Sequence, residues 1–84
     1  MPLYYFDTRD DGLVASDEIG LRLQGIEAAR DVAAKSLAEM ALDALPGSMR
    51  RCLGVDVRDE WSRPVLTAEL IFEARLADDR NNWS

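Results

Sequence analysis

Residues 26–45, IEAARDVAAKSLAEMALDAL, decide how the rest of the chain is interpreted, because their apolar positions recur every three or four residues. This spacing places apolar side chains on one face of an α-helix. Acidic residues in the first two turns complement the positive end of the helix, and Pro46-Gly47 ends it. We predict a helix that begins at Gly25 or Ile26 and ends at Leu45. Its apolar face contains Ile26, Ala29, Ala33, Leu37, Met40 and Ala44.

The segment before the helix has the pattern of a β-hairpin. Leu3 to Asp7 is a short apolar and aromatic run, and Leu13 to Ser16 is a second one. The polar residues between them end in Asp11-Gly12, and an Asp-Gly step between two apolar runs favours a tight turn. We predict a strand over residues 3–7, a turn over residues 8–12 and a return strand, followed by a short extended piece at residues 21–23.

Two runs after the helix alternate between apolar and polar residues, as half-buried strands do. Leu53, Val55 and Val57 point to one side of the first run. In the second run the inward residues are Leu66, Ala68, Leu70 and Phe72, and Pro64 stands at its start, where a missing N–H removes no ladder bond. We therefore predict two strands after the helix, joined by a connector over residues 59–64.

These elements follow the order β-β-α-β-β, which predicts an α+β fold. We expect a two-layer sandwich, in which one helix packs on one face of an antiparallel sheet. Residues 1–76 form this single domain, and the polar residues 77–84 are expected to fray as a tail. A sheet with one helix buries little apolar area for its chain entropy, which favours a homodimer or a partner that completes the core.

Composition excludes several classes of protein. The 84 residues hold 16 Asp and Glu against 10 Lys and Arg, a net charge of −6, which disfavours binding to nucleic acid or to an anionic membrane. The chain has no His and one Cys, so it has no His general base, no His/Cys zinc site and no internal disulfide. No export signal and no apolar window of membrane-spanning length occur, so we expect a cytoplasmic protein.

One acidic segment fits part of a calcium-binding loop. Asp7, Asp11 and Glu18 occupy loop positions 1, 5 and 12, and Gly12 occupies position 6. Arg9 stands at position 3, where a ligand is expected, and its charge repels a cation. Strands flank the segment where an EF-hand has helices. The alternative interpretation is a solvated hairpin tip, with no metal and no other cofactor.

Arg30 lies near the edge of the apolar stripe of the helix and has two interpretations. Its stem can cover the sheet while its guanidinium forms an ion pair with Asp7 or Asp17. The other interpretation is an anion-binding arginine. Arg30→Lys distinguishes them, because only a bidentate structural pair makes that change costly to stability.

Four arginines fall within residues 49–66, against three acidic residues, in an otherwise acidic chain. They are Arg50, Arg51, Arg58 and Arg63, and they form either a phosphate-facing patch or a solvated face. Candidates for catalysis are few, because no nucleophile motif and no Gly-rich phosphate loop occur. Asp17-Glu18 is an adjacent acidic pair in a turn, and Cys52 faces away from the predicted core. We predict that the protein is not an enzyme.

Three large apolar residues lie outside the predicted core. Trp61 stands in the connector, Ile71 on the outer face of the last strand and Trp83 near the C-terminus. Aromatic residues outside a core are enriched at protein interfaces, so the two tryptophans, together with Val65 and Ile71, predict a contact surface for a partner. Ordinary loop packing is the alternative.

Short motifs in a fixed order resemble a family of short bacterial proteins. They are Tyr5-Phe6-Asp7, Asp11-Gly12, Asp17-Glu18-x-Gly20, Glu27-Ala28-Ala29-Arg30, Arg58-Asp59-Glu60 and Arg63-Pro64-Val65-Leu66, with Leu70 and Phe72 after them. Over residues 1–76 the chain resembles the domain of unknown function family 6894, which is frequent in alphaproteobacteria. The resemblance implies an α+β protein of the cytoplasm and no established activity. The chain departs from the family pattern at Gly25, where an acidic helix cap is usual, and at Trp61-Ser62, where small residues are usual.

A more distant similarity is to the HicB-like antitoxins, which share strands followed by a helix and an Asp-Gly turn. These considerations leave two hypotheses for the function. The first is a non-catalytic homodimer or a module that binds an unidentified protein. The second is an antitoxin-like regulator that neutralises a basic partner through an acidic surface. Residues 1–48 hold nine acidic and four basic residues, whereas residues 49–84 hold seven and six, so the negative charge is concentrated in the first part of the chain.

Overall fold

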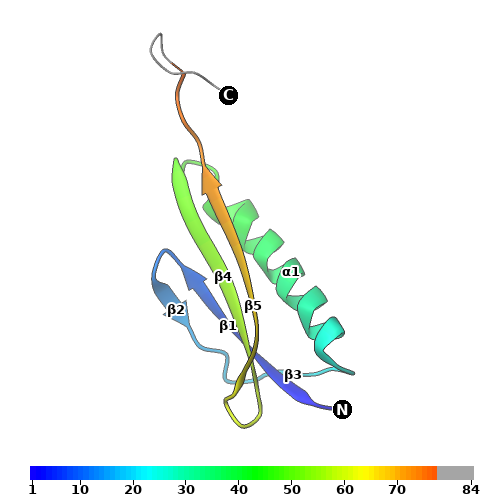
Figure 1. Cartoon of the computed structure of the whole chain (residues 1–84). Helices are drawn as coiled ribbons and strands as arrows, with labels where there is room; N and C mark the ends of the chain where they lie inside the picture. The colour runs from blue at the N-terminus through cyan, green and yellow to red at the C-terminus, as the bar shows by residue number, and fades with distance from the viewer. Residues whose placement is uncertain (78–84) are drawn as a thin grey trace.

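The structure is a computed structural model that describes residues 1–77. It contains one antiparallel sheet of five strands, with one helix packed on one face (Figure 1). The elements are β1 (Leu3–Asp10), β2 (Leu13–Ala15), β3 (Leu21–Arg22), α1 (Ile26–Ala44), β4 (Arg50–Asp59) and β5 (Pro64–Glu73). The predicted α+β class and β-β-α-β-β order are confirmed, and the expected extended piece forms β3. Of the expected tail, only Ala77 lies within the described residues.

The sheet has the strand order β2-β1-β4-β5, and β3 pairs with the same strand as β2 does. β1 lies opposite β4 from Tyr4 to Asp10, and β2 pairs with its last three residues. β3 pairs with its first two residues, Leu3 and Tyr4. One side of the sheet therefore ends in two short strands, and the other ends in β5.

The prediction that the first strand ends at Asp7 is wrong, because β1 continues to Asp10. The turn itself contains only Asp11 and Gly12, both with positive φ, as expected of a two-residue hairpin turn. Arg9 and Asp10 suggested a turn because they are charged, yet each has a carboxylate or guanidinium partner on β4. These cross-strand partners let charged residues extend the strand.

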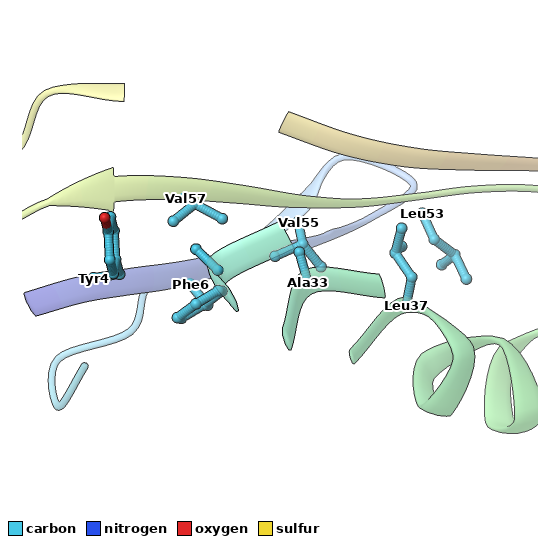
Figure 2. Packing of buried hydrophobic residues seen from close by; sticks show 8 residues of the cluster. Tyr4, Phe6, Ala33, Leu37, Leu53, Val55 and Val57 are labelled. Carbon is cyan, nitrogen blue, oxygen red and sulfur yellow. The ribbon is translucent and has the colours of Figure 1, made fainter. Parts of the chain in front are cut away.

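The core lies between α1 and the central strand β4 (Figure 2). Leu53, Val55 and Val57 are fully buried, as the alternating pattern predicts. Ala29 and Ala33 have no exposed surface, so their small side chains let the helix lie close to the sheet. Tyr4 and Phe6 of β1, together with Leu37, complete the cluster.

The predicted apolar face of the helix is correct apart from its first member. Met40 and Ala44 pack against the core, but Ile26 is 44% exposed. The reason is that Ile26 is the first helical residue, and a helical side chain tilts toward the N-terminus of its helix. Its side chain therefore points past the start of the helix and away from the part of the helix that packs on the sheet. Within residues 1–77, no helix is long and apolar enough to cross a membrane.

Candidate functional site

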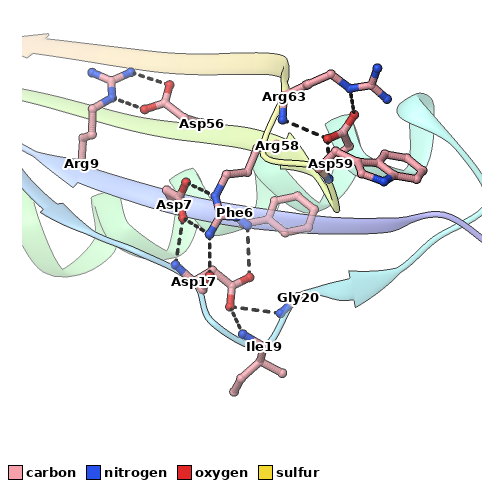
Figure 3. A network of polar contacts seen from close by, with 11 residues as sticks. Phe6, Asp7, Arg9, Asp17, Ile19, Gly20, Asp56, Arg58, Asp59 and Arg63 are labelled. Carbon is pink, nitrogen blue, oxygen red and sulfur yellow. Dashed lines mark hydrogen bonds and ion pairs between the residues drawn. The ribbon is translucent and has the colours of Figure 1, made fainter.

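The face of the sheet opposite the helix carries a ladder of alternating charges. Asp7 of β1 lies directly opposite Asp56 of β4, a pairing that is unfavourable for two carboxylates alone. Each has its own arginine: Arg58 Nε is 2.9 Å from Asp7 Oδ2, and Arg9 Nε is 2.7 Å from Asp56 Oδ2 (Figure 3). Arg9 also reaches Glu69 of β5 at 3.4 Å. We call these five residues the outer-face ladder.

The ladder has consequences for its neighbours. The hydrogen bond from Arg9 lowers the pKa of Asp56 below its ordinary value, against the opposing effect of burial. Gly54 lies directly opposite Arg9, and a Cβ at Gly54 would overlap the guanidinium of that arginine. The absence of a side chain at Gly54 therefore provides the space in which Arg9 crosses from β1 toward Asp56 and Glu69. Arg58 lies over the ring of Tyr5, 4.5 Å from its centroid.

The four arginines proposed as a phosphate-facing patch all bind carboxylates. Arg58 belongs to the outer-face ladder, and Arg51 forms a bidentate pair with Asp10 at 2.7 and 2.9 Å. Arg50 pairs with Glu73, and Arg63 pairs with Asp59. Their charges are thus balanced within the sheet.

The β1 edge of the sheet is closed by a side chain as well as by strands. β2 and β3 pair with opposite ends of β1, which leaves the N–H of Phe6 between them without a strand partner. Asp17 Oδ2 accepts that N–H at 3.1 Å, and the Asp17 N–H donates to Asp7 Oδ1 at 2.8 Å (Figure 3). Asp17 therefore takes the place of a strand residue at this edge.

Asp17 also holds the turn that follows it. Its Oδ1 accepts hydrogen bonds from the N–H groups of Ile19 at 2.9 Å and Gly20 at 3.2 Å. Burial opposes ionisation of this carboxyl, but the three backbone N–H donors and the charge of Arg58 together lower its pKa. The Asp17 carboxylate is thus held by the backbone on both sides of it, at β1 and in the turn.

The opposite edge of the sheet is open. Ala74 N–H donates to Met49 C=O at 2.7 Å, in line with the β4–β5 register, in which Leu53 lies opposite Leu70. Hydrogen-bonded pairs alternate along an antiparallel ladder. The residues of β5 that turn their N–H and C=O groups away from β4 are therefore Thr67, Glu69, Ile71 and Glu73, whereas a register shift interrupts the ladder at Val65. Within residues 1–77, no strand pairs with this side of β5, which we call the open edge.

Apolar side chains accompany the open edge. Ile71, on the outer face, is 64% exposed. On the helix side, an open apolar groove of about 390 Å³ lies between the C-terminal half of α1 and β5. It is lined by Ala38, Ala41, Leu42, Leu45, Pro46 and Phe72. The open edge thus combines unpaired backbone groups with apolar surface on both faces of the sheet.

The structure does not bring the three candidate calcium ligands together. Asp7 binds Arg58, and Asp11 accepts the N–H of Cys52 at 2.9 Å. Glu18 is exposed in the loop that follows β2. Among the described residues no group of three carboxylate or thiol side chains is placed to hold a metal ion.

The proposed partners of Arg30 are wrong. Arg30 is exposed and its Nη2 lies 3.2 Å from Asp31 Oδ1, its sequence neighbour. Arg58 takes the place expected for Arg30, since it binds Asp7 and donates to the C=O of Asp17 at 2.9 Å. The difference arises because Arg30 lies on the helix, whereas Asp7 and Asp17 meet on the other face and at the edge of the sheet.

Two of the three residues proposed for partner contact lie within the described residues. Trp61 is exposed in the β4–β5 turn, where Arg63 lies 5.1 Å from its ring centroid. Ile71 is near the far end of β5, about 24 Å from Pro64 at the rise of a strand. They therefore do not form one surface within a single chain. Trp83 lies outside the described residues, and Cys52 is a half-buried free thiol.

Sequence reasoning missed the open edge and the space at Gly54. Both depend on which strands pair, and no local pattern reports strand order. The model of a family described as "Domain of unknown function (DUF6894)" matches residues 3–71. The chain belongs to this family. No curated protein matches the chain, and no solved structure matches it.

Proposed function

We propose that this DUF6894 protein is a non-catalytic protein-binding module of the bacterial cytoplasm, which binds another protein chain through the open edge of β5. The observation that carries the proposal is the row of backbone N–H and C=O groups along that edge. A long unpaired edge is a template for another strand, and strand addition is a common way to bind an extended segment. The exposed Ile71 and the groove beside Phe72 supply apolar contacts on either side.

The chemistry of the outer face also favours binding over catalysis. A catalytic carboxylate needs a pKa near the working pH and access to a substrate. Asp17 and Asp56 instead have lowered pKa values, caused by hydrogen bonds from backbone N–H groups or from Arg9. Asp7 is held by Arg58 and by the N–H of Asp17.

A proline at Thr67 tests the proposal. Thr67 N–H points away from β4, so Thr67→Pro removes an edge donor without breaking the β4–β5 ladder. It also removes the hydrogen bond from Thr67 Oγ1 to Asp56, 3.0 Å long. Thr67→Val is the matched control, because it removes the same hydroxyl but keeps the N–H.

Binding is measured by sedimentation velocity of the purified chain and by affinity capture from the native host, with circular dichroism to confirm folding. We expect Thr67→Val to associate like the wild type and folded Thr67→Pro to lose at least tenfold in affinity. Equal binding by the two folded variants would rule out the open edge as the binding surface.

A second candidate is the antitoxin-like regulator, which the exposed face of α1 favours. Glu27, Asp31, Glu39 and Asp43 recur at multiples of four and are all exposed, so they form an acidic stripe that winds around the solvent side of α1 and is interrupted by Lys35. Within residues 1–77, only Asp31 of these four forms an ion pair, with Arg30. Such a stripe complements a basic, nucleic-acid-binding partner, and the HicB-like similarity is consistent with this role.

Neutralising the stripe separates the two candidates. The triple variant Glu27→Gln, Glu39→Gln, Asp43→Asn leaves the open edge intact. A regulator that works through the stripe loses its partner in this variant and in high salt. A module that works through β5 retains binding under both conditions. A neighbouring gene for a small basic toxin-like protein would favour the regulator, and a solitary gene would oppose it.

A further inference from the structure

We propose that the open edge of β5 pairs with the same edge of a second copy of this chain, antiparallel and with Ala68 opposite Ala68. This inference rests on the proposed function, since it names the partner of the same edge. A pair of this kind is isologous, so each residue contact occurs twice about a two-fold axis. The two sheets would then join into one sheet, with both helices on the same face.

The backbone restricts the registers in which two β5 strands can pair. In an antiparallel pair, the hydrogen-bonded positions must join residues whose N–H and C=O groups point toward the partner. On the open edge these are Thr67, Glu69, Ile71 and Glu73, which lie in the regular part of the β4–β5 register. The two-fold axis can therefore pass beside one residue, and the central candidates are Thr67, Ala68, Glu69 and Leu70.

The side chains select Ala68 among these. With Ala68 at the centre, Ile71 of the second copy comes beside Val65, the residue at which a register shift interrupts β5. Thr67 then faces Glu69, a hydroxyl beside a carboxylate. On the helix side, Leu66 faces Leu70. Apolar residues thus meet apolar residues on both faces of the sheet.

The other registers produce unfavourable pairs. A centre at Glu69 places two Glu69 carboxylates face to face. A centre at Thr67 places Val65 opposite Glu69, and a centre at Leu70 places Ile71 opposite Glu69. Like charges directly opposite are destabilising, and an apolar side chain beside a carboxylate gains no packing. Ala68 is the centre that avoids all three.

With Ala68 at the centre, the Phe72 end of β5 lies beside the Pro64 end of the second strand, near the groove formed by Leu42, Leu45 and Phe72. Pro64 pairs with Arg58 across a register shift in β5, so its side chain lies on the outer face of the sheet and not in the groove. This register also brings Ile71 of the second copy beside Val65, close to the turn that holds Trp61.

A cysteine at the centre tests the register directly. In a Cys52→Ser background, Ala68→Cys places two thiols opposite each other at a position with a Cα separation of about 4.5 Å. This separation is within the range of a disulfide. The control is Ile71→Cys in the same background, because the two Ile71 positions lie about 20 Å apart in this register. We expect most of the Ala68→Cys protein to form a disulfide dimer under mild oxidation, and Ile71→Cys to stay uncrosslinked.

The outcomes distinguish this inference from the proposed function. Rapid crosslinking of Ile71→Cys, or none of Ala68→Cys in a protein that sediments as a dimer, would overturn the register. A wild-type chain that stays monomeric at millimolar concentration would overturn self-pairing. If such a monomer still captured a host protein, and Thr67→Pro but not Thr67→Val abolished the capture, the proposed function would stand with a different partner. A wild-type chain that neither self-associates nor captures a host protein would overturn both the self-pairing and the proposed function.

Discussion

The two edges of the sheet are treated in opposite ways by the same short chain. At the β1 edge, β2 and β3 cover the ends of the strand and Asp17 accepts the remaining N–H of Phe6. At the other edge, β5 presents ten residues without a described neighbour on that side. Natural sheets avoid accidental pairing by covering or charging their edges. A chain that closes one edge with a dedicated carboxylate and leaves the other open is suited to pairing at the second.

The largest effect on stability is expected from Asp17→Ala, which removes the side chain that closes the β1 edge. The change leaves the N–H groups of Phe6, Ile19 and Gly20 without their acceptor, and loss of a charged acceptor costs about 2–3 kcal/mol of unfolding free energy. Urea unfolding at one fixed protein concentration measures it. Glu18→Ala, at the exposed neighbouring acid, is the control and should change stability by less than about 0.5 kcal/mol. Similar losses in both variants would contradict the role given to Asp17.

A smaller effect is expected from Gly54→Ala, which disturbs the ladder between the two edges. The new methyl group displaces the guanidinium of Arg9 from Asp56 and Glu69, at a cost of about 1–2 kcal/mol. In an Arg9→Ala background the same change should cost nothing, or stabilise the strand, because the space is then empty. A double-mutant cycle by urea unfolding measures the coupling. Additive effects would show that Gly54 is not required to accommodate Arg9.

Low pH is expected to reduce the stability that the Asp17 carboxylate contributes at the β1 edge. Its pKa is lowered in the folded protein, so the unfolded chain binds the proton more tightly. The stabilisation is therefore complete above the ordinary pKa of an aspartate, near 3.8, and is lost as the pH falls through the lower folded value. Thermal unfolding of the wild type and Asp17→Asn between pH 6 and about pH 2 tests this. The Asn variant should show a shallower loss below about pH 4, and parallel curves would exclude Asp17 as a contributor.

The smallest effect is expected at the turn beside the open edge. Trp61→Ala removes a side chain that is 68% exposed and stacks on Arg63, so stability should change by less than about 0.5 kcal/mol. Urea unfolding checks this, with Arg63→Ala as a companion. A loss above about 1 kcal/mol would mean that Trp61 packs against more than Arg63.

The features predicted correctly from the sequence are those whose causes are local. The helix follows from apolar spacing, β4 from the alternation of Leu53, Val55 and Val57, and the first turn from Asp11-Gly12. The errors involve residues far apart in the chain. Arg9 is balanced by a carboxylate 47 positions later, which no local pattern reports. The strand predicted from the sequence therefore ends too early, at Asp7.

The candidate site was less predictable than the fold, for the same reason. Arg30 and Arg58 are equally plausible partners of Asp7 in the sequence, and only the arrangement of helix and sheet decides between them. Ile71 was recognised as an outward apolar residue, but its place on an open edge depends on the strand order. A homodimer was expected because the core is small, whereas the surface that would form it emerged only from the pairing of β4 with β5.

Amide hydrogen exchange, followed by NMR at several protein concentrations, compares the two edges most directly. The N–H of Phe6, bound by Asp17, should be protected at every concentration. The N–H groups of Thr67, Glu69 and Ile71 should exchange rapidly in dilute solution and become protected as the second copy binds. Protection of Phe6 alone, with rapid exchange along β5 up to millimolar concentration, would contradict the pairing of two copies at the open edge.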